Sequence, residues 1–203
     1  MNDNSQQPEI AALISAARAA DRESMDRLLK LYRNYLCLLA HGELSHPFRG
    51  KIDSSDLVQE TLLEAHQAFP KFGGTTEAEL VAWLRKILVR NMTDFVRRFR
   101  AASRDVGREE SYDNLRIVDR LATLGGAVQP SPSHSAQRRE IGVLLADALA
   151  ELSGDHREVI IFRSLQDLPW AEVANRMDRS DEAVRKLWTR ALLELKPVLE
   201  RHL

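Results

Sequence analysis

Arginine side chains gather in one stretch of this sequence, and their chemistry suits phosphate groups. Between Trp83 and Arg108 there are eight basic residues, seven of them arginine: Arg85, Lys86, Arg90, Arg97, Arg98, Arg100, Arg104 and Arg108. Guanidinium groups bind phosphates in a bidentate manner and stack on bases. Because the whole chain has a formal net charge of -1, this cluster is a local field that favours a nucleic-acid contact over a solvated helix end.

The preceding stretch has the opposite sign. No Lys or Arg lies between Ile52 and Gln67, and polar or acidic residues recur there at helical spacing: Asp56, Gln59, Glu60, Glu64 and Gln67. An exposed helix face of one sign suits a basic protein partner. Taken alone, this helix is explained better by a plain solvated face.

A third set of polar residues follows a turn at residues 177–180. We expect Ser180 to cap a helix whose first turn carries Asp181 and Glu182 on its positive dipole end. The outer face of that helix presents Arg185, Lys186, Thr189 and Arg190. In a major groove these groups would contact phosphates and base edges, whereas a helical hairpin with a solvated face explains the same pattern.

Helices must position all of these residues, because apolar residues recur at intervals of three and four and strand signals are nearly absent. Helical patterns cover 9–39, 56–69, 77–100, 141–152, 155–165, 169–177 and 181–201. Residues 101–138 are rich in Ser, Gly and charge, which indicates a linker with one weak helix near 115–124. We therefore predict an all-α fold: two small helical domains, 9–100 and 139–203, on a flexible linker.

Bulk properties narrow the function classes. With 203 residues and 44% hydrophobic content, packed cores are expected. The single cysteine, Cys37, excludes an internal disulfide and fits a reducing compartment. No apolar run reaches the roughly 20 residues of a membrane span, and the first residues lack a signal-peptide pattern. We predict a cytoplasmic protein without membrane insertion.

Motifs for bond chemistry are missing from the sequence. There is no phosphate-cradling glycine loop and no nucleophile elbow. Cys37 and His41 have an i, i+4 spacing that a metal would accept, but no second pair completes a site, so core packing is expected. We predict no catalytic residue, no metal and no cofactor, and a protein that is not an enzyme.

Two blocks of the sequence resemble RNA polymerase sigma factors of the extracytoplasmic-function (ECF) type. Residues 56–61, Asp-Leu-Val-Gln-Glu-Thr, together with Phe69 and Phe72 look like sigma region 2.2, and residues 82–98 look like regions 2.3 and 2.4. Residues 148–160, 169–174 and 179–192 look like region 4. The order and separation of the blocks match as well, and the short linker lacks the region 3 of housekeeping sigma factors.

The resemblance implies a region 2-like helical domain and a C-terminal four-helix domain with a helix-turn-helix. It implies a protein that binds core RNA polymerase, directs it to specific promoters and helps melt them. The residues implied to bind polymerase are Asp56, Gln59, Glu60 and Glu64. Those implied at the minus-10 element are Arg90, Asn91, Asp94, Arg97 and Arg98. Those implied at the minus-35 element are Arg179, Ser180, Arg185, Lys186, Thr189 and Arg190. An anti-sigma or other regulatory protein is left open as a further partner.

One departure from the family concerns the turn, where sigma factors usually have Gly and this chain has Asp178. A left-handed conformation there would suit Asp less well than Gly. Two other functions compete with the sigma-factor interpretation. A stand-alone helix-turn-helix regulator needs neither the acidic helix nor the Arg cluster, and an adaptor that binds polymerase without reading DNA needs no recognition helix.

Overall fold

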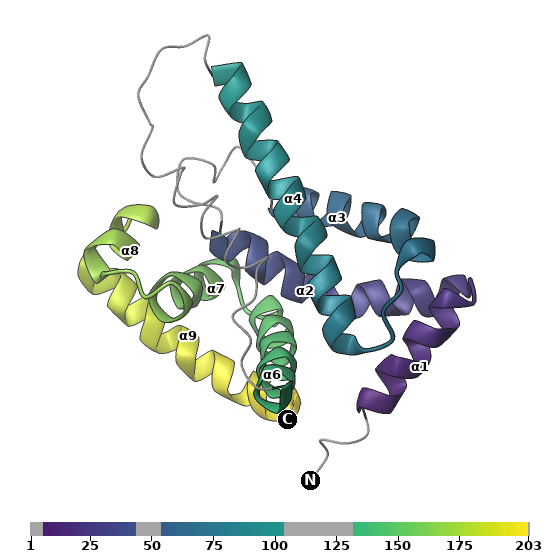
Figure 1. Cartoon of the computed structure of the whole chain (residues 1–203). Coiled ribbons are helices and arrows are strands. Elements are labelled where there is room, and N and C mark those ends of the chain that lie inside the picture. Colours follow the sequence, from purple (N-terminus) through teal and green to yellow (C-terminus); the bar gives the residue numbers. More distant parts are fainter. Residues whose placement is uncertain (1–5, 44–53, 104–131, 203) are drawn as a thin grey trace.

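The computed structural model describes residues 6–43, 54–103 and 132–202, and every regular element in these ranges is helical (Figure 1). The N-terminal half consists of α1 (Gln6–Arg18), α2 (Arg22–Glu43), α3 (Ser54–Ala68), the 3-10 turn η1 (Phe69–Lys71) and α4 (Glu77–Ser103). The C-terminal half consists of α6 (Pro132–Glu151), α7 (Gly154–Ile160), the π turn η2 (Ile161–Leu165), α8 (Trp170–Arg176) and α9 (Asp181–His202). The predicted all-α fold is confirmed.

The helical pattern of residues 9–39 divides into two helices at Ala20, which has a φ of 67°. The Ala20 N–H donates to the Ala17 carbonyl and the Asp21 N–H to the Ala16 carbonyl, each over 3.1 Å. This pair of bonds is a Schellman motif, and it places an alanine where glycine is usual. The Asp21 carboxylate then accepts from the Ser24 N–H at 3.2 Å and caps α2.

The N-terminal core lies among α1, α2, α3 and α4. Its largest fully buried side chains include Tyr32, Phe69 and Leu84. Phe72 and Trp83 extend this core as an aromatic cluster, with ring centroids 5.0 Å apart. Trp83 and Phe95 pack partly buried against the core, as the helical periodicity predicts.

The C-terminal half has its own core, in which Phe162, Val173, Val184 and Ala191 are fully buried. Figure 1 shows α8 and α9 joined by a short turn, with α7 beside them and α6 crossing toward α2. The apolar sides of α8 and α9 thus form part of this core.

The two halves contact one another through α2 and α6. The Asn34 Nδ2 atom donates to Asp147 Oδ1 over 2.8 Å. Ala146 of α6 belongs to the N-terminal core, and Leu38 of α2 packs against the C-terminal core. The two cores predicted from the sequence are present, and they lie against each other rather than apart.

Several element boundaries differ from the prediction. Helix α4 continues to Ser103 and α6 begins at Pro132, so both ends of the predicted linker 101–138 are helical. Pro132 suits the first helical position, where its missing N–H leaves no bond unmade. The predicted weak helix near 115–124 lies outside the described residues. None of the described helices is long and apolar enough to cross a membrane.

Candidate nucleic-acid interface

The outer side of α3 presents an exposed face made of three polar residues, Asp56, Gln59 and Glu60, and one apolar residue, Leu63. Leu57, Val58 and Ala65 bury the opposite side of the helix in the core. Leu63 is 59% exposed, an unusual position for a leucine in a helix that is otherwise well sorted. Leu63 was not among the residues predicted for this face, although its spacing of three and four residues from Glu60 and Gln59 places it there. We call these four residues the α3 face.

Glu64 does not join the α3 face as a free carboxylate, because it forms an ion pair with Arg90 of α4. The side chains are 30% and 57% exposed, respectively. The pair therefore joins a residue predicted to bind polymerase to one predicted to bind DNA. At this exposure it contributes about 1 kcal/mol or less to stability, so its effect is mainly to orient both side chains.

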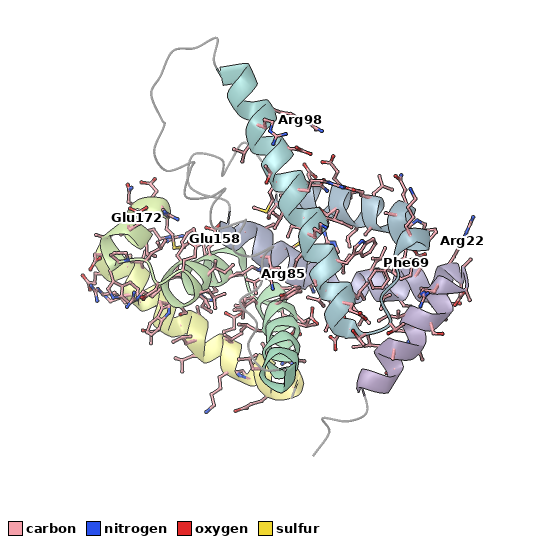
Figure 2. The ribbon with its side chains drawn as sticks, viewed as in Figure 1. Arg22, Phe69, Arg85, Arg98, Glu158 and Glu172 are labelled. Atoms are coloured by element: carbon pink, nitrogen blue, oxygen red, sulfur yellow. The ribbon has the colours of Figure 1, made fainter. Side chains whose placement is uncertain are left out.

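The basic residues of α4 are best exposed where the helix extends past its neighbours. Figure 2 shows Arg98 on this projecting part, and both Arg97 and Arg98 are exposed. Arg97 lies 3.5 Å from Asp94, with the two side chains 76% and 42% exposed. The side chains of Arg100, Arg104 and Arg108 lie outside the described part of the chain.

Asn91 points toward α3. Its Nδ2 atom donates to Thr61 Oγ1 over 3.2 Å, and that hydroxyl donates in turn to the Leu57 carbonyl over 2.8 Å. Thr61 is fully buried, whereas Asn91 is half-buried. The amide of Asn91 thus links α4 to α3.

A capping box fixes where α4 begins. The Glu79 N–H donates to Thr76 Oγ1 over 3.3 Å, and Glu79 Oε2 accepts from the Thr76 N–H at 3.0 Å and the Thr75 N–H at 2.9 Å. These bonds, first that from the Thr75 backbone, hold the pKa of the Glu79 carboxyl below its usual value. Glycine is required at position 74, just before α4, because a Cβ there would come within 2.4 Å of the Phe72 ring.

The turn between α8 and α9 contains a residue in the left-handed conformation, at the position where sigma factors usually have Gly and this chain has Asp178. Asp178 has a φ of 50°. The Arg179 N–H donates to the Ala174 carbonyl over 3.0 Å and the Asp178 N–H to Asn175 over 3.3 Å, which is a second Schellman motif. Ser180 Oγ then accepts from the Ala183 N–H at 3.2 Å, so the predicted N-cap is confirmed.

Two outward cations of α9 are paired with the acids of its own first turn. Arg185 Nε lies 2.8 Å from Asp181 Oδ2 and Lys186 Nζ lies 2.5 Å from Glu182 Oε1. Thr189 Oγ1 donates to the Arg185 carbonyl over 3.1 Å, and Arg190 is exposed.

Before α9, Pro169 precedes α8 as its N-cap residue rather than opening it. Its carbonyl accepts from the Glu172 N–H at 2.9 Å and the Val173 N–H at 3.0 Å. The side chain of Arg179, which precedes α9, does not lie on its outer face; it forms an ion pair with Asp155 at the start of α7. Of the six residues predicted at the minus-35 element, Arg179 is therefore turned toward the protein.

His41 packs between the halves, and the described residues contain no cluster of three His, Cys, Asp or Glu side chains that would hold a metal. Its ring stacks on Phe162 with centroids 6.3 Å apart. Its Nε2 atom lies 4.0 Å from Glu158 Oε1. Cys37, one turn before, lines a cavity of about 400 Å³ among α2, α3, α6, α7 and η2.

The fold and these surfaces define a class of protein: a helical DNA-binding chain with a helix-turn-helix in one half and adjoining acidic and basic helices in the other. Family models agree with both halves. The model for sigma-70 region 2 matches residues 22–102, and that for sigma-70, region 4 matches residues 148–196. The chain belongs to the sigma-70 family of RNA polymerase sigma factors, in its ECF group.

Curated relatives carry the same family name. The ECF RNA polymerase sigma factor SigG of Mycobacterium tuberculosis is 29% identical over 170 residues, covering 76% of this chain and 45% of the relative. The chain thus matches less than half of that relative's length. The ECF RNA polymerase sigma-E factor of Haemophilus influenzae is 25% identical over 187 residues, covering 89% of each protein.

Two solved structures are similar over most of the chain. CnrH, in complex with the cytosolic domain of CnrY, is 20% identical with a TM-score of 0.34, covering 94% of this chain and 97% of that one. A chain of the RsbN–BldN complex is 18% identical with a TM-score of 0.32, covering 91% and 98%.

Proposed function

We propose that this chain is a transcription initiation factor that binds core RNA polymerase, directs it to specific promoters and helps melt them. The observation that carries the proposal is the pairing of surfaces in one packed half: an acidic face on α3 and an exposed basic row on α4, joined by the Glu64–Arg90 pair. Family membership supports the same role. The protein acts by binding energy rather than bond chemistry, and its place is with polymerase in the cytoplasm.

The α3 face is the proposed polymerase contact. Asp56 and Glu60 supply negative charge for a basic partner surface, and charge complementarity raises the association rate and selects the partner. Leu63 supplies apolar area at the C-terminal end of the same face, from which a docked partner would exclude water. Glu64 contributes through Arg90. A regulatory protein such as an anti-sigma factor is a further proposed partner, supported by family membership.

The projecting part of α4 is the proposed minus-10 contact. Arg97 and Arg98 are exposed and would neutralise phosphates on duplex or single-stranded DNA. Arg90 directly precedes Asn91 and pairs with Glu64, and Asp94 lies about one turn after Asn91 and pairs with Arg97. In the proposed open complex, the Asn91 side chain contacts an unpaired base after its hydrogen bond to Thr61 has broken.

The outer side of α9 is the proposed minus-35 contact. Arg185, Lys186, Thr189 and Arg190 are all exposed on one side of a helix whose N-terminus is capped by Ser180. A helix-turn-helix places the N-terminal residues of this second helix against base edges in the major groove.

Charge reversal on the α3 face tests the polymerase assignment. The double variant Asp56→Lys and Glu60→Lys should bind core polymerase at least about tenfold more weakly, with a changed salt dependence, because attraction becomes repulsion. The matched control is Asp26→Lys with Glu200→Lys, which makes the same change of net charge at exposed positions on α2 and α9. Equal affinity and salt dependence for the test variant and the wild type would contradict the assignment.

A further inference from the structure

Arg185 is held in place before any DNA is present. Its guanidinium carbon lies 4.8 Å from the centroid of the Trp170 ring, and its Nε atom lies 2.8 Å from Asp181 Oδ2. Trp170 comes from α8 and Asp181 from the first turn of α9. The side chain is still 52% exposed, so its contacts orient it without burying it.

Trp170 is itself fixed from several sides. The Trp188 ring meets it edge-on, with centroids 5.6 Å apart and an interplanar angle of 81°. Trp188 Nε1 in turn donates to Ser164 Oγ over 3.0 Å, which ties α9 to the π turn η2. A second guanidinium, that of Arg163, lies 5.0 Å from the Trp170 centroid.

Arg163 is anchored as well. Its Nη1 atom donates to Asp167 Oδ1 over 3.1 Å and to the Leu168 carbonyl over 3.0 Å. The segment from η2 to α8 therefore holds the Arg163 guanidinium over the Trp170 ring, and α9 supplies the Arg185 guanidinium. The indole is a rigid platform built by three elements around one outward arginine.

We propose that Trp170 is a positioning residue that fixes Arg185 in the conformation that reads one base pair of the upstream promoter element. The bond of Nε to Asp181 leaves the two terminal Nη groups as a free fork. Such a fork matches guanine O6 and N7 in the major groove. This inference rests on the proposed role of α9 at the minus-35 element.

Preorganisation is the physical reason for the effect. A free arginine loses considerable rotamer entropy on binding, and stacking on an aromatic face removes much of that loss beforehand. Stacking also fixes the plane of the guanidinium. Two parallel hydrogen bonds to one base form only when that plane lies close to the plane of the base. Arg190, exposed on the same helix, serves as the comparison.

Base preference in reconstituted holoenzyme tests the proposal. Core polymerase carrying wild-type or variant chain selects from promoters with a randomised upstream element. Arg185→Ala should lose discrimination at one base pair by at least about fivefold. Trp170→Leu, which keeps apolar volume without a ring face, should lose it at the same base pair, whereas Trp170→Phe should retain most of it. Leu199→Ala removes a side chain that packs against the same C-terminal core but does not touch Trp170 or Arg185; it is the packing control and should keep the preference even if it lowers thermal stability.

The outcomes separate this inference from the function on which it rests. If Trp170→Leu keeps the preference that Arg185→Ala loses, or weakens binding to all sequences equally, Trp170 is structural and the inference is overturned. If Arg185→Ala changes no preference, the assignment of α9 fails with it.

A measurement on the wild-type chain is independent of how the variants fold. The nuclear magnetic resonance order parameter of the Arg185 Nε–H group should approach that of rigid backbone, about 0.85, while that of Arg190 should fall below about 0.6. Equal low values for both would overturn the inference.

Discussion

Asn91 is the residue at which DNA opening is best tested. Recovering the cost of unstacking a base, a few kcal/mol, requires contacts that form after opening, and a side-chain amide both donates to and accepts from base edges. Asn91→Ala should therefore leave closed-complex formation nearly normal and impair melting. Permanganate footprinting on a natural promoter, and on the same promoter with a pre-melted bubble, measures both.

The bond between Asn91 and Thr61 provides the control. Thr61→Val removes the acceptor of the 3.2 Å bond and keeps the side-chain shape, so it reproduces any effect that comes from helix packing. We expect a melting defect in Asn91→Ala that Thr61→Val does not share. Equal defects in the two variants, or a defect of Asn91→Ala that is the same on both templates, would assign Asn91 to packing.

Individual side chains were predictable where one helix determines their exposure. Helical spacing alone placed Asp56 and Glu60 outside and Leu57 inside. The Glu64–Arg90 pair was not predictable, because it depends on how α3 and α4 cross. The same holds for the stack of Arg185 on Trp170, which joins two helices whose relative angle no local pattern contains.

At the scale of elements, the end of α1 carries a measurable strain. Ala20 has a φ of 67°, a region that costs an L-residue roughly 1–2 kcal/mol and glycine almost nothing. Ala20→Gly should raise the free energy of unfolding by about 0.5–1 kcal/mol, after allowance for the greater entropy of glycine in the unfolded chain. Ala19→Gly, at an exposed neighbour without positive φ, should lower it; both are measured by urea denaturation. Destabilisation by both variants to the same extent would refute the strain at Ala20.

The capping box of α4 gives a pH dependence of known sign. Because folding lowers the pKa of the Glu79 carboxyl below its ordinary value, its contribution to stability is fully present at pH values above that ordinary pKa. It is lost as pH falls through the folded-state pKa. Wild type should therefore be more stable than Glu79→Gln at pH 7, and the difference should shrink below about pH 4.5. Glu60→Gln, on the exposed α3 face, gives the effect of an ordinary neutralisation; a gap that is constant with pH would disprove the role of the carboxylate.

Helix identities were predictable from periodicity, and several helix ends were not. The break at Ala20 escaped prediction because the sequence has no Gly or Pro there. Residues 161–165, the π turn η2, were predicted as ordinary helix. Its defining bond, from the Gln166 N–H to the Ile161 carbonyl over 2.9 Å, widens the turn but leaves the spacing of the apolar residues nearly unchanged. The predicted N-cap Ser180 did mark the start of α9, because its side chain acts locally. The capping box that begins α4 was not predicted.

At the scale of the whole molecule, the contact of α2 with α6 could not be read from the sequence. Helical patterns predicted two cores, and the structure joins them through the Asn34–Asp147 bond and the stacking of His41 on Phe162. These contacts link residues more than a hundred positions apart, and no periodicity reports such pairs. The boundaries of the two domains stay a prediction.

The central claim is that this chain gives core RNA polymerase promoter specificity. The most direct measurement is transcription from a library of genomic fragments by purified core polymerase, with and without the chain, followed by mapping of the start sites. The account predicts discrete new start sites that share upstream and minus-10 sequences, and their loss with the variant Asp56→Lys and Glu60→Lys. A chain that adds no start sites, with a core preparation that another sigma factor activates, would contradict the account.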